Sequence, residues 1–233
     1  MKKLRITALL LALAMIFAIP VFASVQLYVT DVFDDVKDGD FAADEIAYFY
    51  NNGIIKGYPD GKFWPERKIE RAEAAAIISR IGDNALGDLD AVDYTDVPSD
   101  SWFANYVLNA TTNGYLVPTN DDKLFDPYGT VDRLGGGLIA GGITGSGDES
   151  GDTTLTDTVA LPFTDLGDLQ LTDEQISLLT NLYQLGVLQM FIEGSSDPKA
   201  PTYQPTLDLT RAQFVMLLSK ATLPPSTPSG VPD

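Results

Sequence analysis

The sequence predicts a mainly α-helical protein made of three helix–loop–helix repeats, packed on each other as one body with approximate threefold symmetry. Three patterns carry this prediction, and each occurs three times in the same order. They are an opening of the type aromatic-x-Asp-aliphatic, an amphipathic run that ends near a glycine, and a second helix start that contains an arginine. Two short helices cannot bury their apolar faces alone, so such units must pack against one another.

Each repeat begins with the same short motif and continues into a first helix. The openings are Phe33-Asp34-Asp35-Val36, Tyr94-Thr95-Asp96-Val97 and Phe163-Thr164-Asp165-Leu166. In the first repeat, Ile46, Phe49 and Tyr50 then recur at helical spacing, and the other two repeats show the same periodicity. The three runs end near Gly53, Gly114 and Gly186, where a helix commonly closes with a left-handed residue.

A loop and a second helix start complete each repeat. The loops are Phe63-Trp64-Pro65, Phe125-Asp126-Pro127 and Tyr203-Gln204-Pro205, and the helix starts lie at 69–73, 131–135 and 209–213. Thr210 is a good N-cap with Gln213 as its capping-box partner, Asp132 can cap the second helix, and Glu70 is a poorer cap by type. The second helix of repeat 2, RLGGGLIAGGITG, is predicted to be weak, because each glycine costs about 1 kcal/mol relative to alanine.

The segments outside the repeats differ from them in composition. Residues 1–23 combine a basic start, a short apolar run and Val21-Phe22-Ala23, which is typical of a secretory signal peptide. The apolar run is short for a membrane span, so a retained N-terminal anchor is the less favoured alternative. We place the repeats at 30–90, 91–145 and 161–222, with a flexible acidic linker at 146–160 and a Pro/Ser-rich tail at 223–233. The third repeat has a longer loop, at 191–205.

Composition excludes several kinds of chemistry. Cleavage after Ala23 removes three of the 15 basic residues and none of the 33 acidic ones, which leaves a net charge of −21 that repels nucleic acid and anionic lipid. The chain has no cysteine and no histidine, so it has neither disulfides nor the commonest general base. No nucleotide-binding glycine motif opens a βαβ unit, and the acidic linker matches a calcium loop only faintly. We therefore predict no enzyme, no cofactor and no metal site, although a glycosidase is not excluded by composition.

The repeats resemble the S-layer homology domain. Repeat 1 carries the resemblance most fully, with its aromatic-x-Asp-Val opening, a helix ending in Gly-Ile-Ile-x-Gly, Pro-Asp-Gly-x-Phe-x-Pro and Arg-Ala-Glu, although Glu70 replaces the usual threonine. Repeat 3 has Gln213 in place of the glutamate, and repeat 2 keeps Arg133 but loses Ala-Glu. The resemblance covers about residues 30 to 222. It implies a three-helix-bundle-like prism and non-covalent attachment to a secondary cell-wall polysaccharide with pyruvylated sugars, and therefore a secreted protein at the cell wall or in an S-layer.

The resemblance also implies sugar sites in grooves between neighbouring repeats. A pyruvate ketal carries a carboxylate, and the planar guanidinium of arginine can bind a carboxylate through two hydrogen bonds. Free backbone N–H groups in the first turn of a helix also attract anions. The candidate glycan-binding residues are Arg71, Arg211, Arg133, Asp35, Asp96, Asp165, Trp102 and Tyr58. Structural alternatives stay open: the arginines could pair with local acids, the aspartates could cap the first helices, and Trp102 could pack in the core.

Two functions fit these observations. The first is anchoring to the cell wall through the polysaccharide. The alternative is a structural subunit of an S-layer or other surface assembly that makes protein–protein contacts without binding glycan, and the altered motif of repeat 2 favours it. Because the net charge repels an anionic polymer, binding must come from local arginine contacts or from bridging cations. The groove of Arg71 is expected to be the best preserved, followed by that of Arg211, with that of Arg133 decayed.

Overall fold

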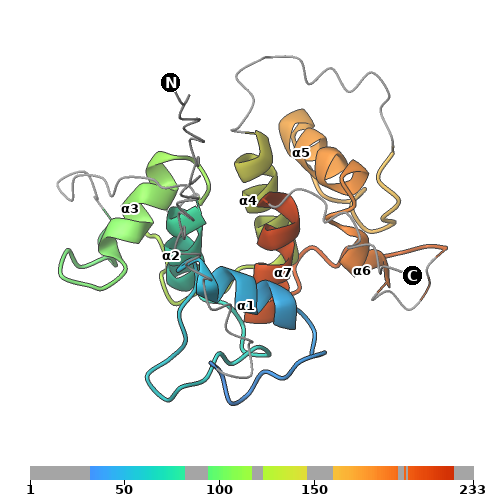
Figure 1. Cartoon of the computed structure of the whole chain (residues 1–233). Helices are drawn as coiled ribbons and strands as arrows, with labels where there is room; N and C mark the ends of the chain where they lie inside the picture. Colours follow the sequence, from blue (N-terminus) through green and yellow to red (C-terminus); the bar gives the residue numbers. More distant parts are fainter. Residues whose placement is uncertain are drawn as a thin grey trace, which may run out of the picture.

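The computed structural model describes residues 32–81, 94–116, 123–145, 160–193, 197 and 199–222. The described part contains helices and no named strands (Figure 1). The helices are α1 (Ala43–Asn51), α2 (Arg71–Ile81), α3 (Ala104–Thr112), α4 (Arg133–Gly145), α5 (Asp173–Gln184), α6 (Gln189–Glu193) and α7 (Arg211–Thr222). The mainly α class is therefore confirmed. No helix in these residues is long and apolar enough to cross a membrane.

Several predicted segments lie outside the described residues. They are the signal peptide, the tail and all of the linker except its last residue. The calcium-loop-like stretch lies in that linker. The boundaries of the repeats also stay predictions.

The first helices end as predicted. Gly53, Gly114 and Gly186 have φ angles of +71°, +73° and +74°, a region that glycine adopts without a steric penalty. The start of α5 is fixed by a capping box between Thr172 and Gln175, a Thr-x-x-Gln pattern that was not among the predictions. The three first helices are therefore closed by equivalent glycines.

The second helices begin at Arg71, Arg133 and Arg211. The predicted capping box is confirmed at Thr210, which exchanges hydrogen bonds with Gln213 at 3.2 and 3.0 Å. Asp132 caps α4, because its Oδ1 accepts the Gly135 N–H at 2.7 Å. The arginines therefore stand at equivalent places, each in the first turn of a second helix.

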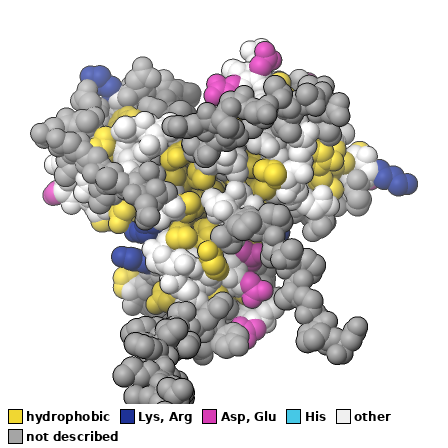
Figure 2. All heavy atoms as spheres, turned by 45° about the horizontal axis from the view of Figure 1, so that its top comes forward, with side chains coloured by type: hydrophobic (Ala, Val, Ile, Leu, Met, Phe, Trp, Pro, Cys, Tyr) yellow, Lys and Arg dark blue, Asp and Glu magenta, His cyan; other side chains and the backbone are white. Residues whose placement is uncertain are grey.

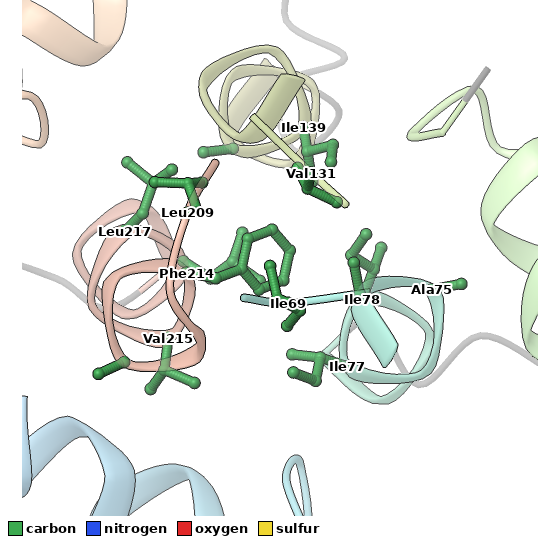
Figure 3. Packing of buried hydrophobic residues seen from close by; sticks show 14 of the residues in the cluster. Ile69, Ala75, Ile77, Ile78, Val131, Ile139, Leu209, Phe214, Val215 and Leu217 are labelled. Atoms are coloured by element: carbon green, nitrogen blue, oxygen red, sulfur yellow. The ribbon is translucent and has the colours of Figure 1, made fainter. Parts of the chain in front are cut away.

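Three loop residues join the repeats in a closed ring of backbone hydrogen bonds. Ile69 N–H donates to the Leu209 carbonyl at 3.0 Å, Leu209 N–H to the Val131 carbonyl at 2.9 Å, and Val131 N–H to the Ile69 carbonyl at 3.2 Å. Their side chains are buried between α2, α4 and α7 (Figure 3). This ring of hydrogen bonds places the three repeats in a cyclic order. The third repeat contributes the same backbone groups to the ring as the other two. The prism arrangement of the helices stays a prediction.

The helices pack in the same cyclic order. Each first helix lies against the second helix of the preceding repeat: α3 on α2, α5 on α4, and α1 on α7. Because the first helix of one repeat covers the second helix of another, a single repeat does not bury its own apolar faces. The sites discussed below lie at the boundaries that this packing creates.

The glycine-rich segment predicted to be a poor helix former is a helix of 13 residues, α4, in the structure. Three of its glycines lie where other elements approach closely. A Cβ atom on Gly136 would overlap Leu209, one on Gly137 would overlap the hydroxyl of Tyr203, and one on Gly141 would lie 2.8 Å from Leu178 Cβ. Close packing thus offsets the low helix propensity of these residues. The long loop predicted in repeat 3 is also partly helical, because it contains most of the five-residue α6.

A pair of alanine variants tests this reading of α4. Gly137→Ala is expected to lower the free energy of unfolding by about 1–3 kcal/mol, since its Cβ would overlap Tyr203 and lie 2.9 Å from Leu179 Cδ2. Gly142→Ala should stabilise by up to about 1 kcal/mol, because its nearest contact, at 3.7 Å to Tyr115, is ordinary. Urea denaturation of both variants measures the difference. Equal stabilisation by the two would show that Gly137 is not tightly packed.

Candidate functional site

Each boundary between repeats contains the same three parts, which we call a clasp: an opening aspartate, the aromatic-x-Pro loop of its own repeat, and the arginine of the preceding repeat. At the first boundary, the Asp96 carboxylate accepts the backbone N–H groups of Phe125 at 2.9 Å and Asp126 at 2.7 Å. The Phe125 carbonyl in turn accepts Nε of Arg71 at 2.8 Å. The structure therefore brings a predicted aspartate and a predicted arginine to the same loop.

The second clasp has an additional contact from α6. Asp165 accepts the N–H groups of Tyr203 and Gln204, both at 2.7 Å. Nη1 of Arg133 donates a hydrogen bond to the Tyr203 carbonyl at 3.0 Å. The buried Nε of Arg133 has no hydrogen-bond partner among the described residues. The ring of Phe191 in α6 lies 4.7 Å from the guanidinium carbon. This burial lowers the pKa of Arg133.

The third clasp contains an internal ion pair. Asp35 accepts the N–H groups of Phe63 at 2.9 Å and Trp64 at 2.8 Å, and Arg211 Nε donates to the Phe63 carbonyl at 2.9 Å. Arg211 is only 4% exposed, and its Nη1 lies 3.3 Å from Oε1 of Glu73. The guanidinium thus has a carboxylate of the chain itself as its counter-ion.

Tyr58 belongs to the same cluster as Arg211. Its hydroxyl donates to Oε1 of Glu73, whose Oε2 accepts the Glu70 N–H at 3.1 Å. The Tyr58 ring lies 4.6 Å from the guanidinium carbon of Arg211. Burial raises the pKa of Tyr58, so the hydroxyl keeps its proton at neutral pH and remains a donor.

A groove opens at the first boundary. Its volume is about 760 Å³, and it lies between the end of α3, one side of α4 and the start of α5, with Arg71 in its wall. The lining residues are Arg71, Asn113, Gly114, Tyr115, Leu116, Thr130, Val131, Asp132, Gly135, Leu138, Ile139, Gly142, Glu174, Gln175 and Leu178. All three repeats contribute to it, because Arg71 comes from the first, α3 and α4 from the second, and α5 from the third.

The charge of Arg71 is influenced by burial and by nearby acids. Burial lowers the pKa of Arg71, and Asp126, Asp96 and Asp132 act in the opposite direction. Its guanidinium carbon also lies 4.6 Å from the ring centroid of Phe125. Arg71 is therefore held in a fixed pose by its own clasp and stays charged, as arginine does in proteins.

The aspartates do not cap the first helices. Each of the three carboxylates accepts two backbone N–H groups of its own loop, as given above, and this fixes the loop whose carbonyl meets the arginine. The middle residue of each loop has a left-handed backbone: φ is +57° at Trp64, +57° at Asp126 and +54° at Gln204. This conformation is costly for residues other than glycine, so two hydrogen bonds to a carboxylate help to hold it.

Trp102 lies apart from the groove. It precedes α3, is 58% exposed, and makes an edge contact with Phe103 at 5.4 Å between ring centroids. The alternative that it packs in the core is therefore wrong, and its ring remains an exposed apolar surface. Phe41, at the matching place in repeat 1, is likewise 49% exposed.

Several residues of this region were not among the sequence candidates. Glu73 was visible as part of the Arg-Ala-Glu motif. The groove residues Tyr115, Glu174 and Gln175 carry no such signal, because they come from helix ends of two different repeats. No cluster of three or more acidic side chains that could hold a metal ion occurs in the described part of the chain.

Comparison with known proteins finds two segments of this chain that are similar to a known family. The family model described as the S-layer homology domain matches residues 32–75 and 93–134. The chain thus contains two segments of the S-layer homology type. Its third repeat lies outside the two matched segments and is supported here by the ring and the clasps.

Its relatives are much longer proteins. It is 31% identical over 101 residues to an S-layer protein of Bacillus licheniformis, covering 43% of this chain and 11% of that protein. It is 30% identical over 105 residues to a cellulosome-anchoring protein of Acetivibrio thermocellus, covering 43% and 23%. It is 25% identical over 189 residues to an S-layer protein of Bacillus anthracis, covering 81% and 21%. The chain therefore spans less than a quarter of each relative.

Proposed function

We propose that this protein is secreted and attaches non-covalently to the bacterial cell wall by binding an anionic secondary cell-wall polysaccharide in the groove beside Arg71. The S-layer homology segments, and relatives that are S-layer and anchoring proteins by name, support a role at the cell surface. The observation that carries the finer proposal is the groove itself, which opens where a clasp holds an arginine in its wall.

The groove combines the groups that an acidic sugar requires. The guanidinium of Arg71 can pair with the carboxylate of a pyruvylated sugar. Asp132, Glu174 and Asn113 offer polar groups for sugar hydroxyls, and Tyr115 offers an aromatic surface. The volume of about 760 Å³ lies within the usual range for sites of small ligands.

Long-range attraction does not explain this binding. The chain carries 33 acidic against 15 basic residues, and the face in Figure 2 shows basic side chains only at separate places. Recognition must therefore rest on contacts inside the groove, where a partly buried charge is less screened than one at the surface. We accordingly expect affinity to depend less on ionic strength than it does for polybasic surfaces.

The other candidate residues take secondary places in this proposal. The guanidinium of Arg133 packs against the ring of Phe191, and Arg211 has Glu73 as its counter-ion. Asp35, Asp96 and Asp165 act by holding their loops. Trp102 offers an exposed ring for a sugar outside the groove, and the hydroxyl of Tyr58 already donates to Glu73. The three relatives described above are structural or anchoring by name, and we propose no catalytic role.

Replacing Arg71 tests the proposal. Arg71→Ala is expected to weaken binding of the full chain to purified sacculi by about 10- to 100-fold, the value of a charge-assisted pair. Arg80→Ala is the matched control, because Arg80 also donates to a backbone carbonyl, that of Ile54, but does not line the groove. It should bind like the wild type. A folded Arg71→Ala variant with undiminished binding would refute the role of this groove.

A further inference from the structure

The three second helices all begin with an arginine, and each has a different residue two positions later. The sequences are Arg71-Ala72-Glu73, Arg133-Leu134-Gly135 and Arg211-Ala212-Gln213. In the cyclic order, this third residue stands at the boundary that holds the arginine of the preceding repeat. Glu73 accordingly meets Arg211, and Gly135 lines the groove together with Arg71. The loss of the glutamate in repeat 2 therefore falls where the groove opens.

Arg211 and Arg71 are held in nearly the same pose. Nε of Arg211 donates to the Phe63 carbonyl at 2.9 Å, and Nε of Arg71 donates to the Phe125 carbonyl at 2.8 Å. The guanidinium carbon lies 4.7 Å from the ring of Phe63 in one clasp and 4.6 Å from the ring of Phe125 in the other. The contact between Arg211 and Glu73 consequently shows how a carboxylate sits against an arginine in such a clasp.

We infer that the carboxylate of the ligand occupies, beside Gly135, the position against Arg71 that the Glu73 carboxylate occupies against Arg211. Gly135 is then a specificity-determining residue that keeps the position open, and Glu73 is a built-in occupant of the equivalent position in the third clasp. The inference rests on the proposed function of the Arg71 groove and adds to it where the acidic group of the sugar is held.

The first and third clasps differ in the space beside the arginine, and Arg71 is not an uncompensated charge. Asp126, Asp96 and Asp132 already act on Arg71, so the cation is partly balanced before any ligand arrives. What distinguishes the first clasp is that position 135 carries no side chain and borders a groove of about 760 Å³. A ligand carboxylate can therefore approach Arg71 from this side, whereas at Arg211 the chain's own carboxylate lies at 3.3 Å.

A side chain at position 135 would meet one tight contact, with the Asp132 oxygen that caps α4. A Cβ atom there would lie 3.1 Å from Oδ1 of Asp132 and 3.6 Å from Cγ1 of Val131, so small shifts suffice. Replacing glycine inside a helix also removes its propensity penalty. Gly135→Glu and Gly135→Gln add side chains of nearly equal size that differ in charge, which makes them a matched pair.

The test measures binding of the full chain to a methyl hexoside that carries a pyruvate ketal, and to the methyl ester of the same compound. The wild type should prefer the acid by about tenfold or more. Gly135→Gln should weaken binding of both compounds and keep the preference for the acid. Gly135→Glu should remove the preference, because its own carboxylate takes the place of the ligand's. Gly135→Asp serves as the charged variant if Gly135→Glu does not fold.

The outcomes separate the two proposals. If Gly135→Glu keeps the preference of the wild type while Arg71→Ala loses binding, the groove functions but the position of the carboxylate is wrong. If Gly135→Gln loses the preference as fully as Gly135→Glu, filled space alone is responsible and the inference is overturned. If Arg71→Ala binds both compounds and sacculi like the wild type, the proposed function itself fails.

Discussion

Replacing Glu73 with alanine is expected to lower the free energy of unfolding by about 3–5 kcal/mol, because it leaves a buried charge without its partner. Arg211 is 4% exposed and has the Glu73 carboxylate 3.3 Å from its Nη1. The same carboxylate accepts hydrogen bonds from the Tyr58 hydroxyl and from the Glu70 N–H. The alanine variant would thus leave several polar groups unsatisfied at the boundary between the third and first repeats.

Thermal and urea denaturation measure this loss, and the neighbouring glutamate supplies the control. Glu70 pairs with Arg67 near the surface, where their side chains are 24% and 41% exposed. Glu70→Ala should therefore cost at most about 1 kcal/mol. Glu73→Gln should fall between the two, since it keeps the volume but not the charge. A Glu73→Ala variant as stable as Glu70→Ala would show that the third clasp does not depend on this ion pair.

Replacing Asp35 with alanine is expected to destabilise the protein by about 2–4 kcal/mol, because two charge-assisted hydrogen bonds are lost together. The Asp35 carboxylate accepts the backbone N–H of Phe63 at 2.9 Å and that of Trp64 at 2.8 Å. These two bonds also fix the Phe63 carbonyl that accepts Nε of Arg211, so the variant loosens the contact between two repeats. The loss should therefore appear in global unfolding and not only in the loop.

The adjacent aspartate is the natural control for this variant. Asp34 is exposed, and Asp34→Ala should change stability by no more than about 0.5 kcal/mol. Hydrogen exchange at the amides of Phe63 and Trp64 reports on the two bonds directly. Unchanged protection of these amides in Asp35→Ala would contradict the clasp.

The local features were predictable from sequence because they depend on neighbouring residues. Gly53, Gly114 and Gly186 mark helix ends, and the capping box of Thr210 and Gln213 is set by their spacing of three. The repeated order of the motifs likewise indicated three equivalent units. Signals of this kind are read within a few positions of the chain.

The contacts between repeats were not predictable in the same way. The sequence showed that Arg71 opens a helix, but not that the carbonyl of Phe125, 54 positions later, would accept its Nε. The glycines of α4 counted against a helix until Tyr203, Leu209 and Leu178 were seen to pack on them. Tertiary packing decided both cases, and helix propensity is only a weak guide where packing is tight.

The position of the groove gives the altered motif of repeat 2 a second interpretation. Its motif looked damaged because Gly135 replaces the glutamate, and this favoured loss of glycan binding. In the structure, Gly135 lines the groove that Arg71 also lines, whereas the intact motif of repeat 1 places Glu73 against Arg211. Under the proposed function, the residue missing from the repeat 2 motif leaves room at the boundary with the neighbouring repeat.

Binding to purified sacculi, before and after chemical removal of the secondary cell-wall polysaccharide, tests the central claim most directly. We expect the full chain to sediment with intact sacculi, to remain in solution with stripped ones, and to be released by the isolated polysaccharide. Equal sedimentation with both preparations, or none with either while the chain still assembles with itself, would contradict glycan anchoring and favour a subunit that makes only protein–protein contacts.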